Sequence, residues 1–147
     1  VILFFGLIPV GFTYYIQTGA WTWEVSVAAL ACGLVIDTML MVNNFRDRDE
    51  DARCDKRTVV VCLGAGVGRW GYFALGATAV ALCLTLLAGG RPWAALLPLA
   101  YLAAHTATWR KMVRIDHGEE LNVCLGETAR NILLFGALFT LGILLGR

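Results

Sequence analysis

Residues 43–58 gather the side chains in this sequence that are best suited to bind a metal ion or a phosphate group. The run holds five of the chain's eleven acidic residues and five of its twelve basic residues. Within it, Asp47, Asp51 and Asp55 recur at every fourth position. On a helix that continued past Asn44, these three carboxylates would share one face, with neighbouring Cβ atoms about 6 Å apart.

Carboxylates stacked in this way repel one another unless a cation lies among them. Mg2+ is the natural candidate, because it takes oxygen ligands, often from one or two carboxylates, and keeps positions for water and substrate phosphates. Lys56 and Arg57 follow directly, and their side chains are suited to contact phosphate oxygens that the metal leaves unneutralised. The pattern therefore favours a site for Mg2+ and a diphosphate group.

The alternative is a solvated loop whose charges pair with each other, because arginines alternate with the acids in this run. A calcium-binding EF-hand also begins with acids at alternate positions, but it is excluded here. Ala52 stands where that loop needs glycine, and Thr58 stands where it needs glutamate. The residues alone leave the metal site and the self-paired loop both open.

The composition indicates a membrane protein. The chain has 147 residues, of which 59% are hydrophobic, and a mean hydropathy of +0.69, well above a typical soluble domain. A net charge of +1 argues against a nucleic-acid-binding surface. The five cysteines form no C-x-x-C pair, so we expect neither a zinc site nor a disulfide framework.

The elements that must position residues 43–58 are apolar runs long enough, or nearly so, to cross a bilayer as helices. A hydrocarbon core about 30 Å thick needs roughly 20 such residues, and helices are expected because backbone groups in lipid must be satisfied internally. The first residue is Val1, already inside an apolar run, so we expect further residues upstream. The five expected helices cover residues 1–18, 21–43 (beginning at Trp21 or Trp23), 70–88, 92–109 and 128–146.

The distribution of basic residues predicts how these helices are oriented. Ten lysines and arginines fall in or beside the loops that follow the second and fourth helices, whereas Arg91 and Arg147 alone lie on the opposite side. Because basic residues concentrate in cytoplasmic loops, we expect both long loops on the cytoplasmic side of a cell membrane.

Three stretches resemble a known family. N-N-F-R-D-R-D-E-D-A-R-C-D-K-R-T, at residues 43–58, is similar to the second aspartate-rich motif of the UbiA superfamily of intramembrane aromatic prenyltransferases. It is most like N-N-L-R-D-x-x-x-D-x-x-x-G-K-R-T, the pattern of the branch that prenylates 1,4-dihydroxy-2-naphthoate in menaquinone synthesis. Residues 5–19 and 121–131 are similar to the fifth helix and to the approach to the last helix of that branch. Asp55 departs from the branch pattern, which usually has glycine there, and matches a three-aspartate form found elsewhere in the superfamily.

The resemblance implies an all-α transmembrane bundle of nine helices, of which residues 1–147 would be the C-terminal part, helices five to nine. The first aspartate motif of the family is absent from these residues, so the N-terminal helices of the same enzyme would be needed as a partner. The implied reaction transfers a polyprenyl group from polyprenyl diphosphate to 1,4-dihydroxy-2-naphthoate with loss of CO2. We expect these 147 residues to be inactive alone.

The alternatives to this reaction are a different acceptor (4-hydroxybenzoate, homogentisate or chlorophyllide) and a non-catalytic membrane protein such as a cation transporter. A transporter fits less well, because its site would lie near the bilayer midplane and not at a helix end.

The resemblance also implies roles for individual residues around a Mg2+ cofactor. The implied catalytic and metal-binding residues are Asp47, Asp51 and Asp55, and the implied diphosphate-binding residues are Lys56, Arg57, Arg46, Asn43 and Asn44.

Other polar residues lie outside this motif. Asp37 lies in the middle of the second apolar run, where an ionisable group is costly. It is expected either to serve the pocket or to face other helices in a neutral or paired state. His105 is expected to be a packing residue, and Asp49 a pairing partner. His117 belongs to a charged loop expected to be a solvated face near the same mouth. The basic residues of 110–114 are expected to anchor the cytoplasmic side, with diphosphate binding as the alternative.

Overall fold

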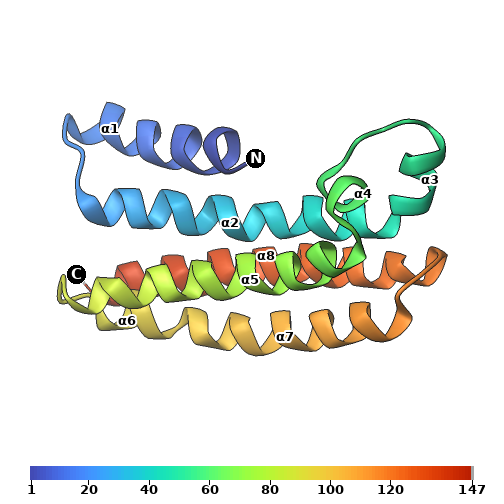
Figure 1. Ribbon diagram of the computed structural model, residues 1–147. Helices are drawn as coiled ribbons and strands as arrows, with labels where there is room; N and C mark the ends of the chain where they lie inside the picture. Colours follow the sequence, from blue (N-terminus) through green and yellow to red (C-terminus); the bar gives the residue numbers. More distant parts are fainter. Residues whose placement is uncertain (147) are drawn as a thin grey trace.

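The apolar runs form long helices that lie side by side and alternate in direction (Figure 1). The computed structural model describes residues 1–146, and within these residues all regular structure is helical, as expected. The elements are η1 (Ile2–Phe12), α1 (Thr13–Thr18), α2 (Trp23–Arg46), α3 (Arg48–Arg53), α4 (Val59–Leu63), α5 (Ala65–Leu84), η2 (Thr85–Leu87), α6 (Pro92–Leu96), α7 (Pro98–Ile115), η3 (Glu119–Leu121) and α8 (Asn122–Leu145).

Each predicted helix is present, but several extend further at the end that carries the charged loops. α5 begins at Ala65, α7 continues to Ile115, and α8 begins at Asn122. The predictions placed these ends at residues 70, 109 and 128, because hydropathy marks only the apolar part of a helix. Charged residues such as Arg69 and Glu127 are tolerated in helical turns that project beyond the lipid core.

Three helices are long and apolar enough to cross a membrane: Trp23–Arg46, Ala65–Leu87 and Glu119–Leu145. The first run forms a shorter apolar helix, Ile2–Thr18. The fourth run is divided into α6 and α7 at Leu97, just before Pro98. A proline inside a helix removes one backbone donor and disturbs the preceding turn, which accounts for this break.

Tight turns connect the helices at the end opposite the charged loops. Gly19 ends α1 with φ of 67°, a left-handed conformation that glycine adopts without a steric penalty. Thr22 then caps α2 by accepting a hydrogen bond from the Val25 amide at 3.4 Å. Pro92 opens α6, where its missing N–H leaves no helical bond unmade.

Close backbone contact joins η1 to α2. A Cβ atom added to Gly6 would lie 2.4 Å from the Ala29 carbonyl oxygen, and one added to Gly33 would lie 2.9 Å from the Ile2 carbonyl oxygen. Small residues at such crossings allow helices to pack in lipid, where no hydrophobic effect drives them together.

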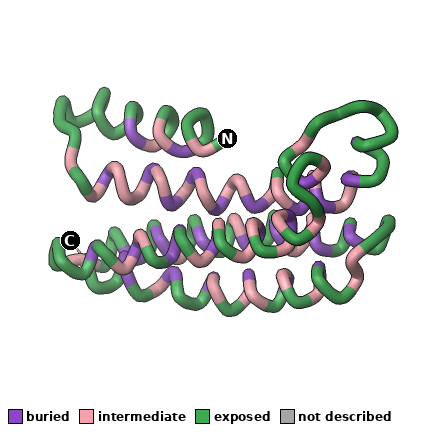
Figure 2. The backbone as a smooth tube through the Cα atoms, in the orientation of Figure 1, coloured by how far each residue is buried: buried purple, intermediate pink, exposed green. Residues whose placement is uncertain are grey.

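The buried side chains form two clusters along the bundle. One lies deep among the long helices and includes Val35, Tyr101 and Phe135. The other lies at the charged end and includes Phe45 and Met112. The charged loops pack against the apolar side chains of this second cluster. Figure 2 shows that much of the outer surface of the long helices is exposed, with Phe4, Ile16 and Leu133 among the exposed apolar residues.

His105 is a packing residue, as predicted. Its side chain is fully buried and stacks on Tyr72, with ring centroids 4.5 Å apart. Its Nε2 lies 3.1 Å from the Tyr72 carbonyl oxygen, and its Nδ1 lies 3.3 Å from the Tyr101 hydroxyl.

Candidate functional site

The two charged loops lie at the same end of the bundle (Figure 1). One contains α3 and α4 and joins α2 to α5. The other joins α7 to α8. They are in direct contact, because Nη1 of Arg48 in the first loop donates a hydrogen bond to the carbonyl oxygen of Asp116 in the second at 2.8 Å.

The aspartate row does not lie on one continuous helix. α2 ends at Arg46, Asp47 caps it with φ of −88° and ψ of 2°, and α3 begins at the next residue. Asp47 and Asp51 remain one turn apart, because the Asp51 amide donates to the Asp47 carbonyl oxygen at 2.8 Å. Asp55 lies beyond the end of α3 with φ of 54°. The expectation of three carboxylates stacked on one continuous helix is therefore wrong, and only the backbone positions of Asp47 and Asp51 keep the one-turn spacing.

The backbone conformation at Asp55 explains why the pattern of the naphthoate branch has glycine at this position. A positive φ is easy for glycine, and aspartate is one of the few other residues that adopt it readily. The side chain of Asp55 is exposed. This position serves the turn between α3 and α4 whether or not its carboxylate has a further role.

Asp47 is held by its neighbour Arg46. The guanidinium Nε donates to Oδ1 at 2.6 Å and Nη2 donates to Oδ2 at 2.8 Å, a two-bond arrangement typical of arginine and carboxylate. Arg46 also contacts the side-chain oxygens of Asn43 at 3.0 Å and of Asn122, on α8, at 2.8 Å. The hydrogen bond from Arg46 lowers the pKa of Asp47, so this carboxylate stays ionised at neutral pH.

Asp51 carries an acceptor with no partner. Its Oδ1 accepts a hydrogen bond from Nζ of Lys56 at 3.0 Å, and the residue as a whole is 7% exposed. Its Oδ2 is buried and makes no hydrogen bond. A buried carboxylate oxygen without a partner is costly, and a bound cation would satisfy it.

Of the other predicted residues, Lys56 contacts Asp51, but Arg57 and Asn44 contact neither aspartate. Lys56 and Arg57 are exposed and Asn44 is half-buried. Neither Arg57 nor Asn44 makes a side-chain hydrogen bond within residues 1–146, and the structure does not bring them to the two aspartates. Thr58 instead has a local structural role, accepting a hydrogen bond from the Val61 amide at 3.3 Å to cap α4.

The donor set fits a metal that is shared with a substrate. Within residues 1–146 no group of three or more histidine, cysteine, aspartate and glutamate side chains lies close enough to hold an ion. Asp51 offers an unpaired buried oxygen, whereas Asp47 would become a ligand only when Arg46 releases one of its two oxygens. Mg2+ usually binds one or two carboxylates and completes its shell with water and phosphate, so the pair suits that ion better than a closed protein cage would.

Comparison with known proteins identifies the family. The model of the UbiA prenyltransferase family matches residues 1–125. The chain belongs to the UbiA prenyltransferase family. Prenyltransferases of this family generally depend on a divalent metal. Membership, together with three helices able to span a bilayer, makes the chain part of a multi-pass membrane protein.

Three curated relatives share the name 1,4-dihydroxy-2-naphthoate octaprenyltransferase. The Haemophilus influenzae protein is 33% identical over 99% of this chain and 48% of its own length. The Escherichia coli protein is 31% identical over 100% of this chain and 48% of its own length. The Mycobacterium tuberculosis protein is 37% identical over 71% of this chain and 37% of its own length. The chain thus spans about half the length of the first two relatives. No solved structure matches it significantly.

The sequence did not reveal which residues of the second loop contact this UbiA motif. Asp116 ends α7 with φ of 61°, and its Oδ1 accepts a hydrogen bond from Nη2 of Arg69 at 2.5 Å. Burial alone would raise the pKa of Asp116, but the hydrogen bond and the charge of Arg69, with Arg48 nearby, outweigh it and leave the pKa lowered. The only signal in the sequence was that both loops carry charges of both signs.

Asp49 and Asp37 are the other acidic residues for which the sequence predicted a role. Asp49 pairs with His117 as a surface contact, with Oδ2 3.2 Å from Nδ1, which confirms that Asp49 is a pairing partner. Asp37 is half-buried in the middle of α2, and its side chain makes no hydrogen bond within residues 1–146.

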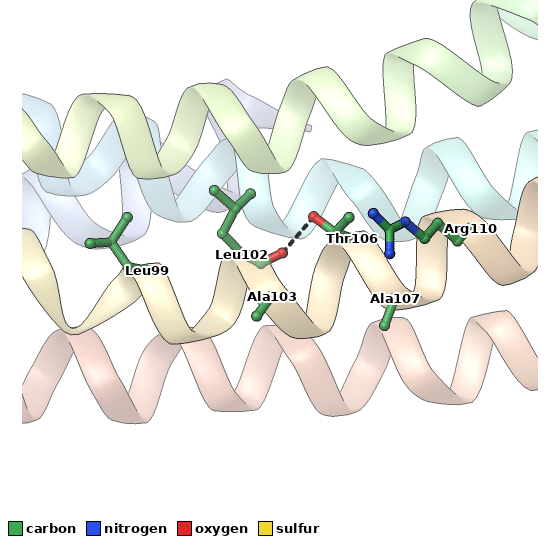
Figure 3. Close-up of a pocket in the computed structure, with 6 residues that line it drawn as sticks. All are labelled: Leu99, Leu102, Ala103, Thr106, Ala107 and Arg110. Atoms are coloured by element: carbon green, nitrogen blue, oxygen red, sulfur yellow. Dashed lines mark hydrogen bonds between the residues drawn. The ribbon is translucent and has the colours of Figure 1, made fainter.

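Two cavities lie away from the acidic motif. A shallow groove of about 410 Å3 follows one flank of α7, as Figure 3 shows, with Arg110 at its end nearest the charged loops. A second cavity of about 490 Å3 lies at the opposite end of the bundle and includes Glu24 and Arg91. Neither brings together groups suited to the chemistry of the family.

Proposed function

We propose that the full-length protein to which this chain belongs transfers a polyprenyl group from polyprenyl diphosphate to 1,4-dihydroxy-2-naphthoate. Loss of CO2 and diphosphate gives demethylmenaquinol, the reduced form of demethylmenaquinone. The relatives' shared name supports the choice of acceptor. The observation that carries the proposal is the pair Asp47 and Asp51, one turn apart at the polar end of an apolar bundle, with an unpaired buried oxygen on Asp51.

In this proposal the chain's residues bind and orient the diphosphate of the prenyl donor. Asp47 and Asp51 would hold the metal, and Asp55, on the turn after α3, would add a third carboxylate. Lys56, Arg57 and Arg46 contact phosphate oxygens, while Asn43 and Asn44 orient metal-bound water or phosphate. Mg2+, when bound, would neutralise charge that develops on the leaving diphosphate.

The chemistry requires that charge be stabilised where it develops. When the allylic C–O bond breaks, its electron pair leaves with the diphosphate, and basic side chains fixed in advance lower the free energy of that state. A ring carbon of the acceptor then bonds to the prenyl carbon, and the carboxylate leaves as CO2. Arg46 is positioned by Asn43 and Asn122, and its guanidinium would turn from Asp47 to the phosphate as that carboxylate binds the metal.

We also propose the placement of the site in the cell. The two charged loops carry most of the basic residues, so the site lies on the cytoplasmic side of the cell membrane. Residues 1–147 supply the C-terminal part of one prenyltransferase domain. The N-terminal helices of the same protein, as the partner, complete the pocket with the other aspartate motif.

A different aromatic acceptor is the second candidate. Asp55 stands where the naphthoate branch usually has glycine, and the three-aspartate form occurs elsewhere in the superfamily. Membranes that carry the full-length protein, supplied with polyprenyl diphosphate and Mg2+, should prenylate dihydroxynaphthoate in preference to 4-hydroxybenzoate or homogentisate. Preference for one of the latter would replace the acceptor and leave the diphosphate site intact.

The site itself is tested with Asp47→Ala combined with Asp51→Ala in the same assay. We expect prenyl transfer to fall at least about a thousandfold, because metal and diphosphate binding are both removed. Glu50→Ala is the matched control, since Glu50 is an exposed acid on the same short helix. Transfer that survives the double substitution would refute the proposed site.

A further inference from the structure

Arg48 lies within the acidic motif, but its side chain makes its hydrogen bonds with Phe45, Asp116 and His117 and with neither of the two aspartates. Its side chain is 8% exposed, and its Nη1 donates hydrogen bonds to the carbonyl oxygens of Phe45 at 2.7 Å and of Asp116 at 2.8 Å. Its guanidinium carbon lies 4.4 Å from the centre of the Phe45 ring. Arg48 therefore fixes the start of α3 both to the end of α2 and to the second loop.

The carboxylate of Asp116 contacts two arginines that belong to different helices. Its Oδ1 contacts Arg69 of α5 at 2.5 Å, and its Oδ2 lies 3.7 Å from Nη2 of Arg48. His117 adds contacts to the same group, with Nε2 2.9 Å from Asp116 Oδ2 and Nδ1 2.6 Å from Arg48 Nη2. One carboxylate thus joins α3, α5 and the end of α7.

The backbone of Asp116 supports a specific purpose for this residue. Its φ of 61° and ψ of −45° lie outside the left-handed helical region that aspartate adopts readily. Strained positions persist where the surrounding contacts hold them, and they gather at functional sites. Here the contacts that hold Asp116 are the same ones that hold the acidic motif.

Arg48 links this network to the metal-binding pair through the chain itself. It directly follows Asp47 and precedes Asp51 by three residues, so its position sets the direction of α3. That direction in turn decides where the unpaired Oδ2 of Asp51 points. A small displacement of a group that binds a reacting substrate can lower activity strongly.

We infer that Asp116 is a positioning residue for the acidic motif. Through Arg48 it holds α3 in the orientation that lets Asp47 and Asp51 engage a metal-bound diphosphate. The inference rests on the proposed function, and it adds to that function a residue from the α7–α8 loop. A role limited to stabilising the fold would leave the affinity for diphosphate unchanged in the folded protein.

The test is binding of inorganic diphosphate with Mg2+ to the purified full-length protein, measured by calorimetry. Asp116→Asn keeps the size of the side chain and removes the charge that attracts Arg48 at 3.7 Å and strengthens the hydrogen bond from Arg69. We expect affinity to fall about tenfold as a result. Arg48→Lys keeps the charge and loses the forked geometry, with an expected loss of similar size. In turnover assays KM for the prenyl diphosphate should rise while KM for the aromatic acceptor stays constant.

Glu119→Gln is the matched control, because Glu119 is an exposed acid of the same loop that makes no ion pair within the described residues. Wild-type affinity in both Asp116→Asn and Arg48→Lys would overturn the positioning role alone. Absence of Mg2+-dependent diphosphate binding in the wild type would overturn the proposed site and this inference together.

A reversible cross-link separates positioning from stability. Asp49→Cys and His117→Cys place thiols on the two loops at side chains now 3.2 Å apart. The background carries Asp116→Asn and has the exposed Cys54 and Cys62 replaced by serine. A short bis-methanethiosulfonate reagent should restore diphosphate affinity to within about threefold of the wild type, and reductant should reverse the rescue. Complete cross-linking without recovery would contradict the positioning role.

Discussion

Two carboxylates of this chain lie in similar partly buried positions and differ in how their oxygens are satisfied. Glu127 on α8 has both oxygens occupied, because Oε1 pairs with Lys111 and Oε2 accepts from the Thr108 hydroxyl at 3.1 Å. Asp51 has one oxygen bound to Lys56 and one that is buried without a partner. The first arrangement joins α7 to α8, and the second leaves an acceptor available to a cation.

The contrast separates a carboxylate whose oxygens are both paired within the bundle from one that keeps an oxygen for a ligand. Asp47 lies between them, because Arg46 occupies both of its oxygens and must release one for a metal to bind. The Glu127 network continues to Asn131, whose amide donates to Thr108 at 3.0 Å. Asn131 also keeps one buried oxygen without a partner, but that group is a neutral amide and is a poorer ligand for a divalent ion. Only at Asp51 does a buried, unpaired oxygen belong to a carboxylate, among the described residues.

The largest expected effect is at Asp51. Asp51→Asn keeps the size of the side chain and an acceptor for Lys56, so we expect the free energy of unfolding to change by less than about 1 kcal/mol. Prenyl transfer by the full-length protein should nevertheless fall at least about a hundredfold, because the amide is a weak metal ligand. Thermal unfolding in detergent and turnover assays measure the two effects. A large loss of stability with activity retained would reverse the contrast.

Glu127→Gln should show the opposite pattern with a smaller effect. It weakens the contact with Lys111, so we expect the free energy of unfolding to fall by about 1 kcal/mol, a modest value because Lys111 is partly exposed. Turnover should stay within about threefold of the wild type. A hundredfold loss of turnover would show that Glu127, like Asp51, acts at the site.

The folding of the chain was largely predictable from its sequence. Apolar runs of nearly bilayer length, ended by glycine and proline, indicated five helices, and the basic residues placed both long loops at one end. Local patterns could not reveal the break at Asp47 or the left-handed turn at Asp55, because both depend on how α3 packs. The predicted helices were too short at the charged end, because charged helical turns are not recognised in a hydropathy profile.

The candidate site was only partly predictable. The motif predicted Asp47, Asp51 and Lys56 from local spacing, and the structure brings Lys56 to Asp51, while their roles stay predictions. The contact of Arg48 with Asp116 joins residues far apart in the chain, and no periodicity in one sequence encodes such a pairing. Arg48 therefore looked like one charge of a self-paired loop, whereas it is the buried link between two loops.

The smallest expected effect concerns pH. Arg46 lowers the pKa of Asp47 below its unfolded value, so their interaction stabilises the folded state fully above the unfolded pKa of about 4. That stabilisation is lost as pH falls through the lower, folded pKa. Between pH 6 and pH 3.5 the melting temperature of the wild type should therefore decline slightly more than that of Asp47→Asn. Equal declines would show that the pair contributes nothing to stability.

The most direct test of the account is whether Asp47 and Asp51 bind a divalent ion together with diphosphate. Electron paramagnetic resonance can count Mn2+, used in place of Mg2+, on the full-length protein with and without inorganic diphosphate. We predict diphosphate-dependent Mn2+ binding that falls by about one ion per protein when both aspartates are replaced by asparagine. Undiminished binding in that double variant would contradict the central claim.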